Sequence, residues 1–204
     1  ALANRGHFAE KLQEALDAAR MEGFALRCTH KPKALSTAPL PEGLFETEEK
    51  DEALAALAHG HVVGGVAWLW AAEQAEAQLD TLFIDEAGQM SLAQVLACSR
   101  AAKNLTLLGD PQQLQQPQRG AHPEGADVSA LAHLLGGEAT IAPERGLFLA
   151  ETWRLAPELC AFTSTLFYSG RLRAHVTATG TVAAPQEATA DIRVDVLELG
   201  PHRS

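Results

Sequence analysis

The sequence is short of several residue types, and each shortage argues against a class of protein. It has three cysteines, Cys28, Cys98 and Cys160, which are widely spaced and odd in number, so neither a disulfide framework nor a zinc site is expected. No apolar run approaches the roughly 20 residues that cross a bilayer. The opening residues, ALANRGHFAEK, lack the basic, apolar and small-residue order of a signal peptide. We therefore expect a cytoplasmic protein that does not enter a membrane.

Basic residues are also scarce. The 16 Lys and Arg are outnumbered by 26 Asp and Glu, which gives a net charge of −10 over 204 residues. This sign argues against long-range steering toward phosphate, although a local basic groove remains compatible with it. The 47% hydrophobic share is that of a globular chain, long enough for one domain or for one domain and part of another.

The centre of the chain has the pattern of a βαβ unit. The apolar run TLFI, from Thr81, predicts a buried strand, and NLTLL, from Asn104, predicts the next one. Between them SLAQVLACSRAAKN predicts a helix, with Ser91 and Gln94 as a capping box. Such units build parallel sheets with helices on both faces, so the fold class predicted is α/β.

Other segments are assigned from apolar periodicity and from Gly and Pro. Helices are expected at residues 8–20 and 47–60, near 128–135, and from Pro157 onward, the last with Leu159, Phe162 and Leu166 on its inner face. In the central helix the inner face is expected to carry Leu92, Val95 and Leu96. Strands are expected from Gly23 and at 146–150 and 191–199, loops at 29–43 and 115–127, and either strand or helix at 61–70.

Three acidic residues follow the two central strands. Asp85 and Glu86 come after the first strand, and Asp110 comes after the second. Ligands of open α/β sheets bind at the carboxyl ends of strands, where these acids are expected to meet. An Asp–Glu pair there suits an NTPase, one acid for Mg²⁺ and one for the attacking water. A turn with two solvated acids is the alternative that the pair alone leaves open.

Three longer segments occur in order: FIDEAGQM, LLGDPQQL and ETWRLAPELCAFTSTLFYSGRL. Together they resemble motifs II, III and IV of superfamily 1 helicases, nearest to the branch with the nonsense-mediated-decay helicase and bacterial nuclease–helicase fusions. The segment RGAHPEGADVSALAHLL resembles this branch as well. The resemblance covers about residues 60–175. It implies a RecA-like, P-loop NTPase-type parallel sheet with flanking helices, residues 1–150 belonging to a first RecA-like domain and 151–204 beginning a second.

The resemblance also implies roles for individual residues. Asp85 matches the Mg²⁺ ligand, Glu86 the residue that activates water, and Gln113 the glutamine that senses the γ-phosphate and couples it to nucleic acid. Arg154 matches an arginine that reaches the γ-phosphate from the second domain. A polar loop residue and a salt bridge at a helix start are the alternatives for Gln113 and Arg154. The residues implied to lie on the nucleotide side of the site are Asp85, Gln89, Gly109 and Asp110, and the resemblance implies that Gly109 and Asp110 shape the turn of motif III.

The phosphate-binding loop G-x-x-x-x-G-K-[ST] is absent from the sequence. The Gly pairs in VGGV and LGGE lack the following lysine. In the helicases this loop lies before the part that resembles residues 1–20, and further motifs follow the second-domain segment. We therefore expect a truncated motor core, whose parent protein hydrolyses ATP with Mg²⁺. The isolated chain is expected to bind neither tightly and to be inactive.

Several other residues invite a functional interpretation. His59 and His61 could suggest a metal site, but two histidines without further ligands are expected to be solvated or capping. Trp153 is a candidate for base stacking, whereas Trp68 and Trp70, in an apolar segment, are predicted to be core residues. The helicases contact single strands near this segment with a threonine where this chain has Val66, which argues against a direct contact.

The function implied for the parent protein is an ATP-dependent helicase or translocase. Its expected partners are single-stranded nucleic acid, DNA in preference to RNA, the remaining helicase domains and, as in some of the branch, a fused nuclease domain. A non-catalytic RecA-like module used for protein interaction is the alternative. A non-helicase P-loop NTPase is disfavoured because Gln113 and Arg154 both fit the helicase arrangement.

Overall fold

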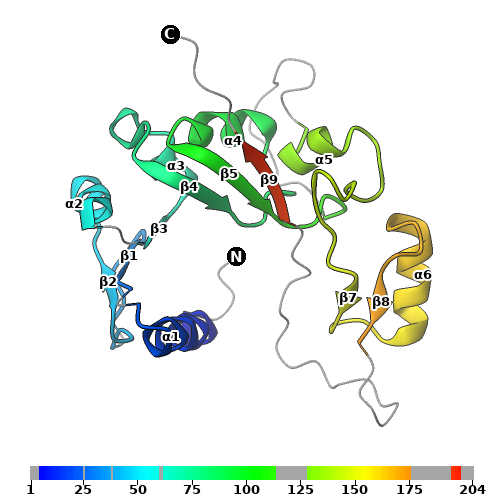
Figure 1. The fold of residues 1–204 in the computed structure, drawn as a ribbon, viewed down its shortest axis with the longest axis horizontal. Helices are drawn as coiled ribbons and strands as arrows, with labels where there is room; N and C mark the ends of the chain where they lie inside the picture. The colour runs from blue at the N-terminus through cyan, green and yellow to red at the C-terminus, as the bar shows by residue number, and fades with distance from the viewer. Residues whose placement is uncertain are drawn as a thin grey trace. The chain divides into compact units, whose positions relative to one another are not determined.

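The structure, a computed structural model, describes residues 5–24, 26–37, 39–59, 62–113, 128–175 and 194–198. The chain is mixed α/β (Figure 1) and falls into two compact units, residues 1–79 and 80–204. Within the described residues, helices are too short or too polar for any of them to cross a bilayer. The 150/151 boundary expected between two RecA-like domains is a different division and stays a prediction.

The first unit is built on a small parallel sheet. Its strands have the order β2-β1-β3, and β1 pairs in parallel with both neighbours. Its elements are α1 (Arg5–Met21), β1 (Cys28–Lys31), β2 (Leu44–Glu46), α2 (Lys50–Ala55), the 3-10 helix η1 (Ala56–His59), β3 (Val62–Gly65), α3 (Ala67–Trp70) and the 3-10 helix η2 (Glu73–Ala75). The ambiguous segment 61–70 thus contains a strand followed by one helical turn.

The end of α1 explains why no strand forms at Gly23. Gly23 has φ +87° and donates its N–H to Arg20 O at 2.9 Å, while Phe24 N–H reaches Ala19 O at 2.8 Å. This is a Schellman ending, which needs a left-handed residue that glycine adopts without strain. The strand expected to begin at Gly23 is therefore wrong in position. The strand that forms in this region is β1 (Cys28–Lys31), and most of it falls in residues 29–43, which were expected to be a loop.

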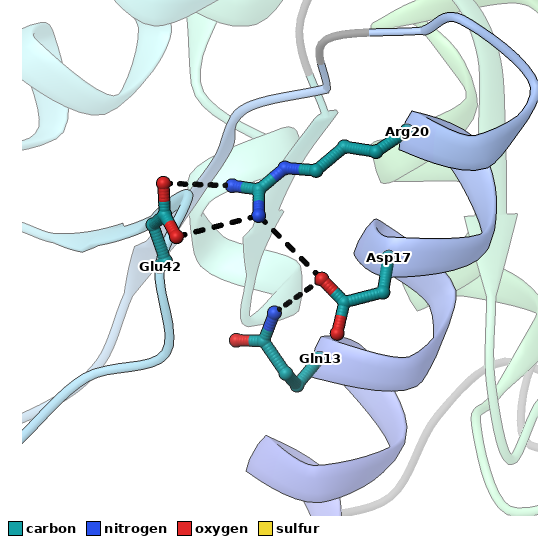
Figure 2. Close-up of polar contacts among 4 residues, drawn as sticks. All are labelled: Gln13, Asp17, Arg20 and Glu42. Carbon is teal, nitrogen blue, oxygen red and sulfur yellow. Dashed lines mark hydrogen bonds and ion pairs between the residues drawn. The ribbon is translucent and has the colours of Figure 1, made fainter.

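Polar contacts at the end of α1 join it to the turn before β2, as Figure 2 shows. Arg20 lies 3.2 Å from a carboxylate oxygen of Glu42 and 3.5 Å from Asp17, which also accepts from Gln13 Nε2 at 2.9 Å. All four residues are partly or fully solvent-accessible, so such pairs contribute only about 0–1 kcal/mol. Beneath them a core of Leu16, Cys28 and Leu44 does more to hold α1 on the sheet.

The second unit contains the central βαβ segment. Its larger sheet has the order β4-β5-β9-β6, and a two-stranded parallel sheet pairs β7 with β8 (Figure 1). The elements are β4 (Leu79–Ile84), α4 (Leu92–Ser99), β5 (Ala102–Leu108), α5 (Ala130–Leu135), β6 (Gly146–Leu147), β7 (Glu151–Thr152), α6 (Pro157–Phe167), β8 (Arg173–Ala174) and β9 (Val194–Glu198).

The larger sheet is mixed rather than wholly parallel. β9 pairs antiparallel with both β5 and β6. β4 and β5 run in the same direction, because Asp80 near the start of β4 meets Lys103 and Asn104 near the start of β5, and Ala87 beyond β4 meets Leu108 at the end of β5. The parallel arrangement of β4 and β5 agrees with the predicted βαβ unit. The expectation of a wholly parallel sheet is wrong, because β9 is antiparallel to its neighbours. The strand expected at 146–150 is reduced to the two residues of β6.

The start of α4 is confirmed, but its inner face differs from the expected one. Ser91 Oγ accepts from Gln94 N–H and Gln94 Oε1 accepts from Ser91 N–H, which completes the capping box. Val95 is buried as expected, together with Cys98, whereas Leu96 is 58% exposed. With 3.6 residues per turn, the stripe through Val95 and Cys98 turns Leu96 outward.

The prediction of the inner face of α6 is wrong. Pro157 occupies the first turn as expected, but Leu159, Phe162 and Leu166 are all more than half exposed. The buried residues of this helix are Cys160 and Ser164, four positions apart on the opposite stripe. The apolar periodicity located the helix correctly, and packing selected the smaller side chains for the inside.

Candidate functional site

Two turns lie in backbone contact: the first, acidic turn (residues 85–90) follows β4, and the second turn (residues 109–113) follows β5. Ala87 N–H donates to Leu108 O at 2.8 Å. Gly88 lies so close to the second turn that a Cβ atom on it would stand 2.0 Å from the carbonyl oxygen of Asp110. Asp85 and Asp110 therefore lie at the same sheet edge, as the βαβ pattern predicts. The close approach needs glycine because any side chain at residue 88 would meet backbone atoms.

The first turn holds Glu86 in a strained conformation. Glu86 has φ +55°, and its N–H donates to Asp85 Oδ1 at 2.9 Å. A non-glycine residue in the left-handed region costs about 1–3 kcal/mol and persists where the surroundings impose it, often at functional sites. Here the surroundings are the Asp85 side chain on one side and the second turn on the other. The strain sets the direction in which the Glu86 carboxylate leaves the strand end.

Gln89 joins the two turns through its side chain. Its Nε2 donates to Gln113 Oε1 at 2.9 Å and reaches Glu86 Oε2 at 3.3 Å. A side-chain amide carries two N–H groups, so both bonds can exist at once. Residues 24 positions apart in the chain are thus linked by one amide. Glu86 and Gln113, assigned separately by the resemblance, share this partner.

Asp110 uses its carboxylate to brace the second turn. Oδ1 accepts from Gln112 N–H at 2.9 Å, and Oδ2 accepts a hydrogen bond from the hydroxyl of Tyr168, at the end of α6. The turn also has Gly109 at φ +142°, where a Cβ atom would meet the backbone of residues 86 and 87. The roles implied for Gly109 and Asp110 as turn-forming residues agree with this geometry. Tyr168 was missed, because no sequence pattern links residues 58 positions apart.

Arg154 is not brought to the acidic turn by any contact among the described residues. It follows β7, is exposed, and donates its backbone N–H to Thr152 Oγ1 at 3.3 Å. Its neighbour Trp153 stacks on His175, with ring centroids 3.4 Å apart. His175 Nδ1 also lies 3.3 Å from Glu151 Oε2. The salt bridge considered as an alternative for Arg154 is likewise absent from the described residues.

The donor set at Asp85 suits a hard divalent cation that also binds phosphate. Asp85 is exposed, its Oδ1 is occupied by Glu86 N–H, and Oδ2 has no hydrogen-bond partner within the described part of the chain. Mg²⁺ bound to a nucleotide commonly takes one or two protein carboxylates and fills its remaining positions with water and phosphate oxygens. A cage made of protein alone is not available, since the described residues contain no group of three or more His, Cys, Asp or Glu suited to a metal.

The other candidate residues have separate outcomes. His59 is exposed at the end of η1, and His61 lies outside the described residues. Trp70 is buried as expected, but Trp68 is 85% exposed, so the prediction that it is a core residue is wrong. The single turn of α3 buries Leu69 and Trp70 and leaves Trp68 on the outer side, beside the exposed Val66.

The opposite ends of β4 and β5 carry an ion pair that is separate from the acidic turn. Lys103 Nζ lies 2.8 Å from Asp80 Oδ1. The hydrogen bond and charge of Lys103 lower the pKa of Asp80, and Asp80 raises the pKa of Lys103 in return. On α4, burial raises the pKa of the Cys98 thiol. Asp80 and Lys103 lie near the starts of β4 and β5, at the end of the sheet away from the two turns.

Comparisons of the chain with protein-family models, with curated proteins and with solved structures gave no match. A function for this chain therefore depends on the residues of the two turns and on the motif resemblance.

Proposed function

We propose that this chain carries the water-activating and coupling part of an ATP-dependent nucleic-acid motor of the superfamily 1 helicase type. The observation that carries the proposal is the amide of Gln89, which binds both Glu86 and Gln113 at the shared end of β4 and β5. The resemblance assigns water activation to Glu86 and γ-phosphate sensing to Gln113. A side chain that links them supplies the physical coupling that such a site requires.

The chemistry follows from what each side chain can do. Asp85 would hold the Mg²⁺ that comes with the nucleotide, and this ion would neutralise phosphate charge and orient the terminal phosphoryl group. Glu86 accepts the proton of the attacking water, and its strained backbone holds the carboxylate at the mouth of the strand end. Gln113 reports the state of the terminal phosphate to Gln89 and so to Glu86.

Arg154 has a different part in the proposal. An arginine that stabilises transition-state charge must approach the γ-phosphate when the cleft between two domains closes. The exposed position of Arg154 beside β7 is compatible with such an approach. We further propose that the phosphate-binding loop and the remaining domains are supplied outside this segment. Single-stranded DNA would be the substrate, and a fused nuclease domain is compatible with the resemblance.

The decisive experiment is Glu86→Gln in a protein that contains this segment together with a phosphate-binding loop. The amide keeps the size of the carboxylate but cannot accept a proton, so hydrolysis should nearly stop while ATP affinity persists. Single-turnover hydrolysis and equilibrium ATP binding measure the two effects. Glu144→Gln, an exposed glutamate of the same unit, is the matched control. Hydrolysis by Glu86→Gln at the wild-type rate would refute the proposal.

A non-catalytic interaction module is the rival function. The isolated 204-residue chain does not separate the two, because both expect it to be inactive. Calorimetry on this chain tests a different point, namely that nucleotide contacts come mainly from a phosphate loop that it lacks. We expect no binding in the micromolar range. Micromolar ATP affinity would mean that the chain holds nucleotide by residues other than those proposed.

A further inference from the structure

A path of hydrogen bonds, joined through the covalent bonds of Asp110 and Gln113, begins at the only tyrosine of the chain. Tyr168 caps the C-terminal end of α6, and its hydroxyl donates to Asp110 Oδ2. The second oxygen of that carboxylate accepts from Gln112 N–H. A carboxylate that is held at both oxygens has little rotational freedom, so the position of Asp110 depends on where Tyr168 lies.

The path continues from Asp110 to Glu86. The carbonyl of Asp110 accepts from Gln113 N–H at 3.3 Å, and Gln113 Oε1 accepts from Gln89 Nε2 at 2.9 Å. The same Nε2 reaches Glu86 Oε2 at 3.3 Å. Each step is a direct contact between polar atoms. Because Asp110 and Gln113 connect these contacts covalently, a change at the tyrosine hydroxyl can reach the Glu86 carboxylate.

The far end of the path is held by a second set of contacts. The ring of Tyr168 lies 6.1 Å from that of Phe148, and the Arg171 guanidinium sits 4.7 Å above the Phe148 ring. Arg171 also donates to Thr140 Oγ1 at 2.7 Å and to Ile141 O at 3.3 Å. Tyr168 thus packs against Phe148, which follows β6, and Arg171 links Phe148 to the residues that precede β6. These contacts hold the tyrosine ring in place while its hydroxyl donates to Asp110.

We propose that Tyr168 is a positioning residue, which sets the Asp110 turn and, through Gln113 and Gln89, the Glu86 carboxylate. This rests on the proposed function of Glu86. A movement of α6 would withdraw the hydroxyl, loosen the turn and misalign the carboxylate. The α6 segment therefore controls whether the acidic turn is ready to activate water.

The path itself can be tested on the 204-residue chain, without nucleotide. Incorporation of 3-fluorotyrosine places one fluorine-bearing residue in the chain, so its ¹⁹F NMR spectrum reports Tyr168 alone. We expect Asp110→Ala to shift the resonance, and Gln113→Ala and Gln89→Ala to shift it in the same direction by less. Gln112→Ala is the matched control, because Gln112 joins the path only through its backbone N–H.

Two results from this experiment would overturn the inference. One is a resonance that does not move in Asp110→Ala, which would mean that the hydroxyl bond is absent. The other is a shift in Gln112→Ala as large as that in Gln89→Ala, which would mean a nonspecific response of the turn. Circular dichroism on each variant checks that a shift does not come from unfolding.

The positioning role is tested in the protein with a phosphate-binding loop. Tyr168→Phe keeps the ring and removes the hydroxyl, so we expect an unchanged Kd for ATP and a kcat lowered roughly 10- to 100-fold by misalignment. A wild-type kcat in Tyr168→Phe, with Glu86→Gln inactive, would refute this inference and leave the proposed function intact. If Glu86→Gln is as active as wild type, the proposed function fails, whereas the fluorine result still decides whether the path exists.

Discussion

The close approach of the two turns makes Gly88→Ala the most informative substitution for the fold of the site. A Cβ atom on residue 88 would lie 2.0 Å from the oxygen and 2.7 Å from the carbon of the Asp110 carbonyl, and 3.2 Å from Pro111 N. All three neighbours are backbone atoms, so no side chain can rotate away to relieve the collision. The turns must separate by roughly 1 Å before the methyl group fits.

The cost of that separation can be estimated from the bonds that cross the gap. Forcing a methyl group into a packed site costs about 1–3 kcal/mol. The Gln89–Gln113 bond at 2.9 Å and the Ala87–Leu108 bond at 2.8 Å would be stretched beyond hydrogen-bonding distance, each with a net loss of about 0.5–1.5 kcal/mol. We expect Gly88→Ala to lower the free energy of unfolding by about 2–6 kcal/mol in total.

Urea unfolding followed by circular dichroism measures this loss, and hydrogen exchange at the Ala87 amide locates it. Gly136→Ala is the control: Gly136 has φ +61° at the end of α5 but no atom within 4 Å of its would-be Cβ. Gly136→Ala should lower the free energy of unfolding only by the backbone strain, about 1–2 kcal/mol. Hydrogen exchange at the Ala87 amide should stay as slow as in the wild-type protein. The close approach of the turns would be refuted if Gly88→Ala were as stable as the wild type, or if it lost no more stability than Gly136→Ala.

Three further predictions concern the second unit. Ser91→Ala removes the capping box and should cost about 1 kcal/mol in urea unfolding, whereas Ser91→Thr should restore most of it; equal losses in both would contradict the cap. Cys98 and Cys160 are almost fully buried, and burial also raises the pKa of Cys98, so both thiols should react with Ellman's reagent only on unfolding; fast labelling of folded protein would contradict their burial. Lys103→Gln should raise the pKa of Asp80 toward its ordinary value in an NMR titration. The stabilisation from a lowered carboxyl pKa is present above the unfolded pKa and lost as pH falls through the folded one, so the variant should differ least from wild type in strong acid.

The local pattern was enough to predict elements whose signals are contained in a few consecutive residues. The capping box at Ser91, the proline at the start of α6 and the strand–helix–strand order of β4, α4 and β5 depend on neighbours in sequence. The shared edge of Asp85 and Asp110 followed from the same pattern, because parallel strands place their carboxyl ends together. The catalytic and Mg²⁺-binding roles of these acids stay predictions, as does the RecA-like fold.

The faces of helices were predicted less well, since they depend on what packs against them. Apolar periodicity favoured Phe162 as an inner residue of α6, but it is 63% exposed, while the small Cys160 is buried. Trp68 was assigned to the core by composition and lies outside, because a single helical turn can bury only one side. The antiparallel pairing of β9 with β5 could not be predicted from the sequence either, because the paired residues are 86 or more positions apart and leave no local pattern.

The sequence by itself determined which residues could do chemistry: an acid pair after an apolar strand, a second acid after the next strand, and glutamines at fixed offsets from both. Only the tertiary structure decided which of them meet. The Gln89 amide links Glu86 to Gln113, and Tyr168 reaches Asp110 from the end of a distant helix. The physical reason is that a hydrogen bond needs its atoms within about 3 Å, and a contact that short between distant residues is set by how the backbone packs, as at Gly88, rather than by spacing along the chain.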